Sequence, residues 1–182
     1  MDAIDPSSAP AVVAAELGGF NTRQIIELLR SICVSADVIG VDFLGGAGAE
    51  SISDGSGENY INGGNGADVI NLVADSATDV LDYNCLSDGG DTINGFDAQA
   101  PGAGGDVIDL VNLLATGSFT GSTFDQAVDG GYMALENVLT DTIVKVDLDG
   151  NGDDFVEVAT VTNTTALELD DNIWVAPDIP IA

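Results

Sequence analysis

The chain has no histidine and little positive charge: 3 lysine and arginine residues stand against 31 aspartate and glutamate residues, a formal net charge of −28 at pH 7. Without histidine there is no HExxH zinc site and no Ser-His-Asp triad, and the sequence contains neither a GxSxG motif nor a Walker loop. Nucleic acid and anionic membrane surfaces are excluded as natural partners, because like charges repel. We therefore expect a protein that is not an enzyme.

Long apolar runs and aromatic residues are also scarce. No stretch reaches transmembrane length, and residues 1–19 have no basic region and only a short apolar segment, broken by Glu16. We therefore predict neither membrane insertion nor a cleaved N-terminal signal peptide. One tryptophan and three tyrosines give little support for the sugar cleft of a glycosidase. The hydrophobic fraction is nevertheless 45%, which is sufficient for a folded core.

The two cysteines, Cys33 and Cys85, are far apart in the sequence. A zinc site is not expected from two cysteines without histidine. A disulfide between them, an interchain disulfide and two buried thiols all remain open, because spacing alone does not decide among them.

Three windows of nine residues follow one another over residues 45–71: GGAGAESIS, DGSGENYIN and GGNGADVIN. Each matches or approximates G-G-x-G-x-D-x-U-x, where U is a large aliphatic residue. The glycines let the first six residues curl into a tight loop, and the last three then extend as a short strand. Ile52, Ile61 and Ile70 occupy the eighth position and point into a narrow core. A flexible linker would not repeat isoleucine at this period.

Two such windows complete one coil, so the loops of residues 45–53 and 63–71 should stack on one edge and residues 54–62 on the opposite edge. This arrangement is a parallel β-roll. Carbonyl oxygens and the sixth side chain turn inward together, which suits a hard cation with 6–8 oxygen ligands. The third window fits at every fixed position, whereas Glu50 and Asn59 are weaker ligands. The ligands predicted here are Gly46, Gly48, Glu50, Gly55, Gly57, Asn59, Gly64, Gly66 and Asp68.

Two further segments, SDGGDTINGFD at residues 87–97 and GGDVIDL at residues 104–110, continue the glycine and aspartate pattern. With the nonapeptides they resemble the RTX family, the calcium-binding repeat proteins exported by type I secretion. The likeness covers about residues 41–175 and extends to the irregular end of such rolls and to C-terminal secretion-target regions. It implies several calcium ions, the type I secretion machinery as a partner, and an extracellular or cell-surface location. It adds Asp88, Asp91, Asp97, Asp106 and Asp109 to the ligands.

Calcium should also control folding. Crowded carboxylates oppose compaction, and divalent cations relieve this repulsion where the carboxylates cluster. We expect the chain to stay loose where calcium is scarce and to fold in millimolar calcium outside the cell.

We expect an all-β roll whose two ends are covered by the rest of the chain. Residues 1–35 should form an arm and an N-terminal capping helix over residues 23–32, with a partner-binding helix as the alternative. Residues 36–110 should form the roll, with residues 37–39 and 42–44 as either a degenerate opening coil or one plain strand. Residues 111–182 should form a C-terminal β cap and secretion-target-like region, continuous with the roll. It should contain a hairpin of residues 142–147 and 155–161 and a closing strand at residues 172–175.

The turn of this hairpin carries Asp147, Asp149, Asn151 and Asp153 at alternate positions, as in the first half of an EF-hand loop. The twelfth position is Val158 and not glutamate, so a true EF-hand is not expected. The turn is either a second calcium site or a polar turn in which Asn-Gly and Asp-Gly supply positive backbone angles.

These observations predict a structural role. The chain begins at Met1 and has little room for a catalytic domain, so we expect a complete, self-assembling extracellular subunit of a surface layer, matrix or filament. Subunits would form a homo-oligomer or polymer by strand addition. One alternative is the calcium-binding secretion cassette of a larger exported hydrolase or adhesin. Another is a calcium-dependent glycan-binding module.

Overall fold

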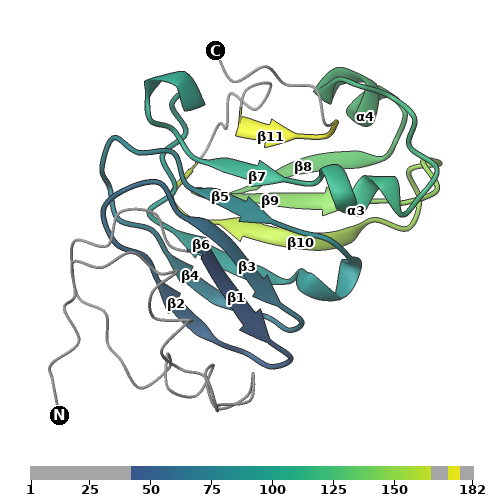
Figure 1. The fold of residues 1–182 in the computed structure, drawn as a ribbon. Coiled ribbons are helices and arrows are strands. Elements are labelled where there is room, and N and C mark those ends of the chain that lie inside the picture. The colour runs from purple at the N-terminus through teal and green to yellow at the C-terminus, as the bar shows by residue number, and fades with distance from the viewer. Residues whose placement is uncertain (1–41, 165–171, 177–182) are drawn as a thin grey trace, which may run out of the picture.

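The computed structural model describes residues 42–164 and 172–176, which are coloured in Figure 1. In this part the chain is mostly β, with few and short helices, which confirms the expected class. The predicted capping helix at residues 23–32 and Cys33 lie outside the described residues. No helix among the described residues is long and apolar enough to cross a membrane.

Successive strands of the repeat region alternate between two sheets. The first sheet has the order β1 (Asp42–Gly46), β3 (Tyr60–Gly64), β5 (Val80–Asp82), β7 (Val107–Asp109) and β11 (Ile173–Trp174), all paired in parallel. The second has the order β2 (Ser51–Ser53), β4 (Val69–Asn71), β6 (Asp91–Asn94), β10 (Val156–Val161), β9 (Asp141–Val146) and β8 (Met133–Val138). Its pairs are parallel as far as β10 and antiparallel beyond. Figure 1 shows the two sheets as separate layers.

The strand register matches two nonapeptides per coil. Ile52 faces Ile70 across β2 and β4, and Phe43 faces Ile61 across β1 and β3, an offset of 18 residues in both pairs. The first and third windows therefore lie on one edge and the second window on the other. Residues 42–44 lie in β1, which pairs in parallel with β3. Residues 37–39, which the sequence grouped with them, lie outside the described residues.

The core is a row of aliphatic side chains between the two sheets. Ile52, Ile61 and Ile70 are all buried. The same hydrophobic cluster continues through Leu81 and Ile93 into the C-terminal part of the described chain, with Leu113, Leu114, Val144, Val161 and Ile173 among its members. The repeats and the residues after them therefore share one core.

The predicted hairpin is present, because β9 and β10 pair in antiparallel register. β10 also pairs in parallel with β6, so the hairpin extends the second sheet. The elements that the sequence did not predict are β8, the helices α3 (Val111–Ala115) and α4 (Phe124–Asp129), and the 3-10 turns η1 (Leu86–Asp88) and η2 (Pro101–Ala103). At five or six residues the helices are too short to show a helical period.

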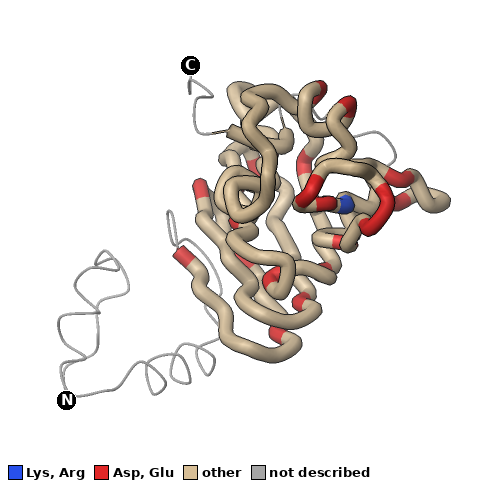
Figure 2. Tube along the Cα trace, turned by 90° about the vertical axis from the view of Figure 1, so that its right-hand side faces the viewer, with Lys and Arg blue, Asp and Glu red and all other residues tan. Residues whose placement is uncertain are grey.

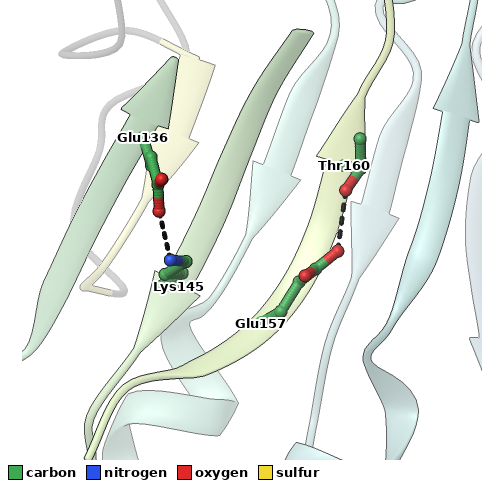
Figure 3. Close-up of polar contacts among 4 residues, drawn as sticks. All are labelled: Glu136, Lys145, Glu157 and Thr160. Carbon is green, nitrogen blue, oxygen red and sulfur yellow. Dashed lines mark hydrogen bonds and ion pairs between the residues drawn. The ribbon is translucent and has the colours of Figure 1, made fainter. Parts of the chain in front are cut away.

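Acidic positions recur in the loops along the described chain, as Figure 2 shows. Lys145 on β9 is the one basic residue among the described residues. It forms an ion pair with Glu136 on β8 at the surface of the second sheet (Figure 3). An exposed pair of this kind contributes little to stability. Protein cations of the described region therefore do not balance the carboxylates of the loops.

Candidate metal-binding site

Carboxylates form a hydrogen-bonded ladder along one edge of the coils. The main-chain N–H of Glu50 donates to Asp68 Oδ1 at 2.7 Å, and that of Asp68 donates to Asp91 Oδ1 at 2.8 Å. Asp91 Oδ2 accepts from the hydroxyl of buried Tyr83 at 3.0 Å. Glu50, Asp68 and Asp91, here called the first ladder, stand just before or at the start of β2, β4 and β6. Strand pairing therefore fixes the spacing of these side chains.

The opposite edge carries a second ladder, made of Asn59, Asp79 and Asp106. The N–H of Asn59 donates to Asp79 Oδ1 at 2.9 Å, and the N–H of Asp79 donates to Asp106 Oδ1 at 3.1 Å. The N–H of Asp97 donates to the other oxygen of Asp106 at 2.8 Å. These residues stand just before β3, β5 and β7. The two edges therefore share one arrangement. In each ladder, a carboxylate accepts the main-chain N–H of the ladder residue in the preceding coil.

The loops of the first edge stack backbone against backbone. Gly64 has a φ of +81°, and a Cβ there would lie 2.3 Å from the carbonyl oxygen of Gly46. Gly66 has a φ of +124°, and its Cβ would lie 2.7 Å from the carbonyl oxygen of Gly48. Only glycine combines these angles with this approach. The carbonyl oxygens of Gly46 and Gly48 therefore face the next loop along the edge.

Three buried carboxylate oxygens among the described residues accept no hydrogen bond. They are Oδ2 of Asp68, a residue with 1% exposure, Oδ2 of Asp54, with 7% exposure, and Oδ1 of Asp82, with 6% exposure. A buried carboxylate without a partner costs several kcal/mol, so it requires a proton or a cation. The atoms around the ladders are carboxylate and carbonyl oxygens, the donors that calcium prefers. The residues present therefore fit a calcium ion.

The pKa values of several buried carboxyl groups in and beside the ladders are raised. Burial raises the pKa of Asp91 and Asp106 to about 7, and raises those of Asp68 and Asp79 above their ordinary value. Burial, and then the charge of neighbouring Asp79, raise the pKa of Asp54 to about 7. Without a metal, Asp54, Asp91 and Asp106 would therefore be partly protonated near neutral pH.

We expect the metal-free protein to be more stable at about pH 5 than at about pH 8. A carboxyl with a raised pKa binds more protons in the folded than in the unfolded state between about pH 4 and 7, so the free energy of unfolding falls as the pH rises. Asp54, Asp91 and Asp106 all act in this direction. Melting temperatures in metal-stripped buffers of equal ionic strength test this. A higher melting temperature at the alkaline pH would contradict it.

The hairpin turn brings a second acidic group together. Ligand oxygens of Asp147, Asp149, Asp153 and Asp154 all lie within 4.8 Å of one another. Asp147 is buried and accepts the N–H of Asp149 at 3.1 Å and that of Gly152 at 2.8 Å. Burial acts to raise the pKa of Asp147, but these N–H groups outweigh it and lower the pKa to about 2. The charge of Asp147 in turn raises the pKa of Asp154.

The turn lies beside η1, since Leu86 lines the same shallow hollow as Asp147 and Asp149. Asn151, predicted with these acids, accepts the N–H of Asp153 at 3.3 Å through Oδ1. The turn is flanked by strands, as the sequence indicated. It could hold a cation through its carboxylates.

Asp88 has a local structural role. Its Oδ2 accepts the N–H of Asn84 at 3.1 Å and that of Cys85 at 3.3 Å, and its Oδ1 accepts the Cys85 thiol at 3.0 Å. Asp88 thus caps the start of η1. The structure does not address the Cys33–Cys85 disulfide, because Cys33 lies outside the described residues.

Other predicted ligands lie apart from the ladders or are hydrogen-bonded within their own loop. Asp97 Oδ1 accepts the N–H of Gln99 at 2.9 Å. Asp109 ends β7 instead of preceding it, and its Oδ1 accepts the N–H of Val111 at 3.0 Å. The carbonyl oxygens of Gly55 and Gly57 accept hydrogen bonds from the side chain of Asn59.

Three acids of these sites were missed by the sequence analysis: Asp54, Asp79 and Asp154. Asp79 was detectable, because residues 79–82 (DVLD) repeat the order of residues 68–71 (DVIN) without a preceding glycine pair. Asp54 occupies a position where the repeat has glycine, so the repeat pattern did not indicate an acidic site residue there. Asp154 lies directly after the alternating acids and breaks their spacing.

Comparisons with known proteins give only distant likenesses. A family model described as the arginase family matches residues 1–45, less than half of the chain and mostly outside the described residues. No curated protein matches. Among solved structures, the chain is similar to the AlgE6R3 subunit of the Azotobacter vinelandii mannuronan C5-epimerase, at 23% identity and a TM-score of 0.44, covering 79% of this chain and 83% of that one. The AlgE6R2 subunit of the same epimerase is 21% identical, with a TM-score of 0.37 and coverage of 80% and 96%. These likenesses do not define a function.

Proposed function

We propose that this chain is a calcium-binding parallel β-roll of the RTX type, which folds when calcium binds between its stacked loops. The observation that carries the proposal is Asp68. Its carboxylate is 1% exposed, is held in place by the N–H of Glu50, and has an oxygen that accepts no hydrogen bond. Calcium would supply the missing positive charge.

The first ladder and its loop carbonyls would hold calcium on one edge. Asp68 and Glu50 would contribute carboxylate oxygens, and Gly48 would contribute a carbonyl oxygen that faces the neighbouring loop. The carbonyl oxygen of Gly46 already accepts the N–H of Asn65 at 2.8 Å and would be a ligand only through its second lone pair. The acidic turn that begins at Asp147 would form a separate site. On this proposal the protein's own groups position the oxygens, and the ion offsets the repulsion among them.

We further propose an extracellular structural role after export by type I secretion, as the RTX resemblance implies. Among the described residues no strand pairs with the outer edges of β1 and β2. Unpaired edges of this kind accept strands from other chains. Leu44 on β1 is 75% exposed, which adds apolar area for such a contact. Subunits would assemble through this end of the coils into a homopolymer.

Two measurements test this function. Calorimetric titration of calcium into the metal-free protein should show binding of several ions, with dissociation constants of about 10⁻⁴–10⁻³ M, the extracellular class. Electron microscopy should show ordered polymers in calcium that disappear after chelation. A titration without binding heat would defeat the calcium proposal. Dispersed monomers in both conditions would defeat the assembly role and leave the secretion-cassette alternative.

A further inference from the structure

The second window differs from the third at the position of its ligand side chain. Asn59 stands where the third window has Asp68, and it is buried, with 2% exposure. Its side-chain nitrogen Nδ2 lies 2.7 Å from the carbonyl oxygen of Gly57, 3.0 Å from that of Gly55 and 3.0 Å from Asp79 Oδ1. The amide therefore points its nitrogen at three oxygens, from its own loop and from the next coil.

The chemistry of these oxygens fixes the orientation of the amide. Two are carbonyl oxygens, which only accept hydrogen bonds, and an ionised carboxylate also only accepts. An amide oxygen in this position would face acceptors alone. The NH₂ group satisfies them instead, and in the second loop it occupies the space between two loop carbonyls and a ladder carboxylate.

The third window lacks such an internal donor. Asp68 offers only acceptor oxygens, and its Oδ2 accepts no hydrogen bond. In both the second and the third window, glycines curl the loop, and a strand of the coil follows directly. At the ligand position the two windows therefore differ in one side chain: a carboxylate that needs positive charge in the third window, and an amide that brings its own donor hydrogens in the second.

We propose that the Asn59 amide takes the place of a calcium ion in the loop of residues 54–59. This inference rests on the proposed function and refines it. The amide hydrogen bonds close the ligand position of the second loop, so no ion binds there and the protein binds fewer ions than its number of loops indicates. Oδ2 of Asp54, at the first position of this window, accepts no hydrogen bond and is not part of this closure. Replacing Asn59 by aspartate would bring two carbonyl oxygens and two carboxylates together, which are the donor types that calcium prefers.

The test compares the number of bound calcium ions in the wild type, Asn59→Asp and Asn59→Ala, by calorimetric titration and by native mass spectrometry. We expect Asn59→Asp to bind one ion more than the wild type. In chelator it should melt at a lower temperature than the wild type, because a new carboxylate then faces Asp79 without a cation. Asn59→Ala should bind as many ions as the wild type and melt at a lower temperature in both buffers, because it loses only the amide hydrogen bonds.

Asn137→Asp is the matched control. Asn137 is exposed on β8 and accepts a hydrogen bond from Thr142 through Oδ1, which aspartate can also accept. It adds the same charge without loop carbonyls, so its ion number should equal that of the wild type.

Two outcomes would overturn the inference. Loss of an ion in Asn59→Ala would make Asn59 a calcium ligand, and an unchanged ion number in Asn59→Asp would show that the loop cannot hold calcium. Failure of the proposed function is distinct, because the wild type itself would then bind no calcium. An Asn59→Asp variant that binds one ion when the wild type binds none would support the role of the amide and reject the calcium roll.

Discussion

Removing calcium should lower the melting temperature by about 5–10 °C for each ion that the fold binds. A ligand at 100 times its dissociation constant stabilises the native state by about 2.7 kcal/mol. For a chain of this size, each kcal/mol shifts the melting temperature by about 2–4 °C. With several ions the effect is the largest that we expect from any single change of conditions. Circular dichroism melts in excess calcium and in excess EGTA measure it.

The physical cause is the arrangement of the carboxylates. Asp68 and Asp91 are consecutive members of the first ladder, each with 1% exposure and a raised pKa. Lys145 is the one basic residue of the described part, and it already pairs with Glu136 at the surface. Neither solvent nor a basic residue of the described part therefore stabilises these charges, which leaves protons or metal ions to do so.

Magnesium at equal concentration is the control for ionic strength. It demands a smaller, nearly ideal octahedral shell and gives up water reluctantly, so it should raise the melting temperature much less than calcium. Equal melting curves in EGTA and in calcium would remove the physical basis of the proposed function.

The regular part of this fold could be predicted from the sequence because its period is fixed. Isoleucine at every ninth residue and paired glycines determined which residues face the core and which loops share an edge. The 18-residue offset between Ile52 and Ile70 follows directly from two windows per coil. A local pattern was sufficient here, because each coil contacts mainly its neighbours.

The irregular part was less predictable because the spacing grows along the chain. Successive ladder residues are separated by 18 and then 23 residues on the first edge, and by 20 and then 27 residues on the second. The longer loops include η1 and η2, which add residues without changing the strand register. Asp79 was missed for this reason, although it stands in the second ladder between Asn59 and Asp106.

Side-chain roles depended on contacts that no spacing encodes. Asp88 has the residue type of a ligand, yet its carboxylate caps η1. Asn59 was expected to be a weak ligand, whereas its nitrogen faces the oxygens of the loop. An oxygen is most available to a cation where N–H groups do not already donate hydrogen bonds to it. The packing of the coils determines which oxygens accept such bonds.

Replacing Asp68 by asparagine should change stability in opposite directions in the two buffers. Asparagine keeps an oxygen that can accept the N–H of Glu50 and removes the buried charge beside Asp91. In chelator the variant should therefore melt at a higher temperature than the wild type, by about 2–4 °C for each kcal/mol of relieved desolvation. In excess calcium it should melt about 5–10 °C lower, because at least one bound ion loses a charged ligand.

Asp125→Asn is the matched control, because Asp125 is exposed on α4 and the charge change is the same. Its effect should be at most about 1 kcal/mol and of the same sign in both buffers. The opposite signs expected for Asp68→Asn separate a metal ligand from a structural acceptor. A purely structural carboxylate would contribute through the N–H of Glu50 alone, so its replacement would shift both melting curves in one direction. That result would remove Asp68 from the calcium site.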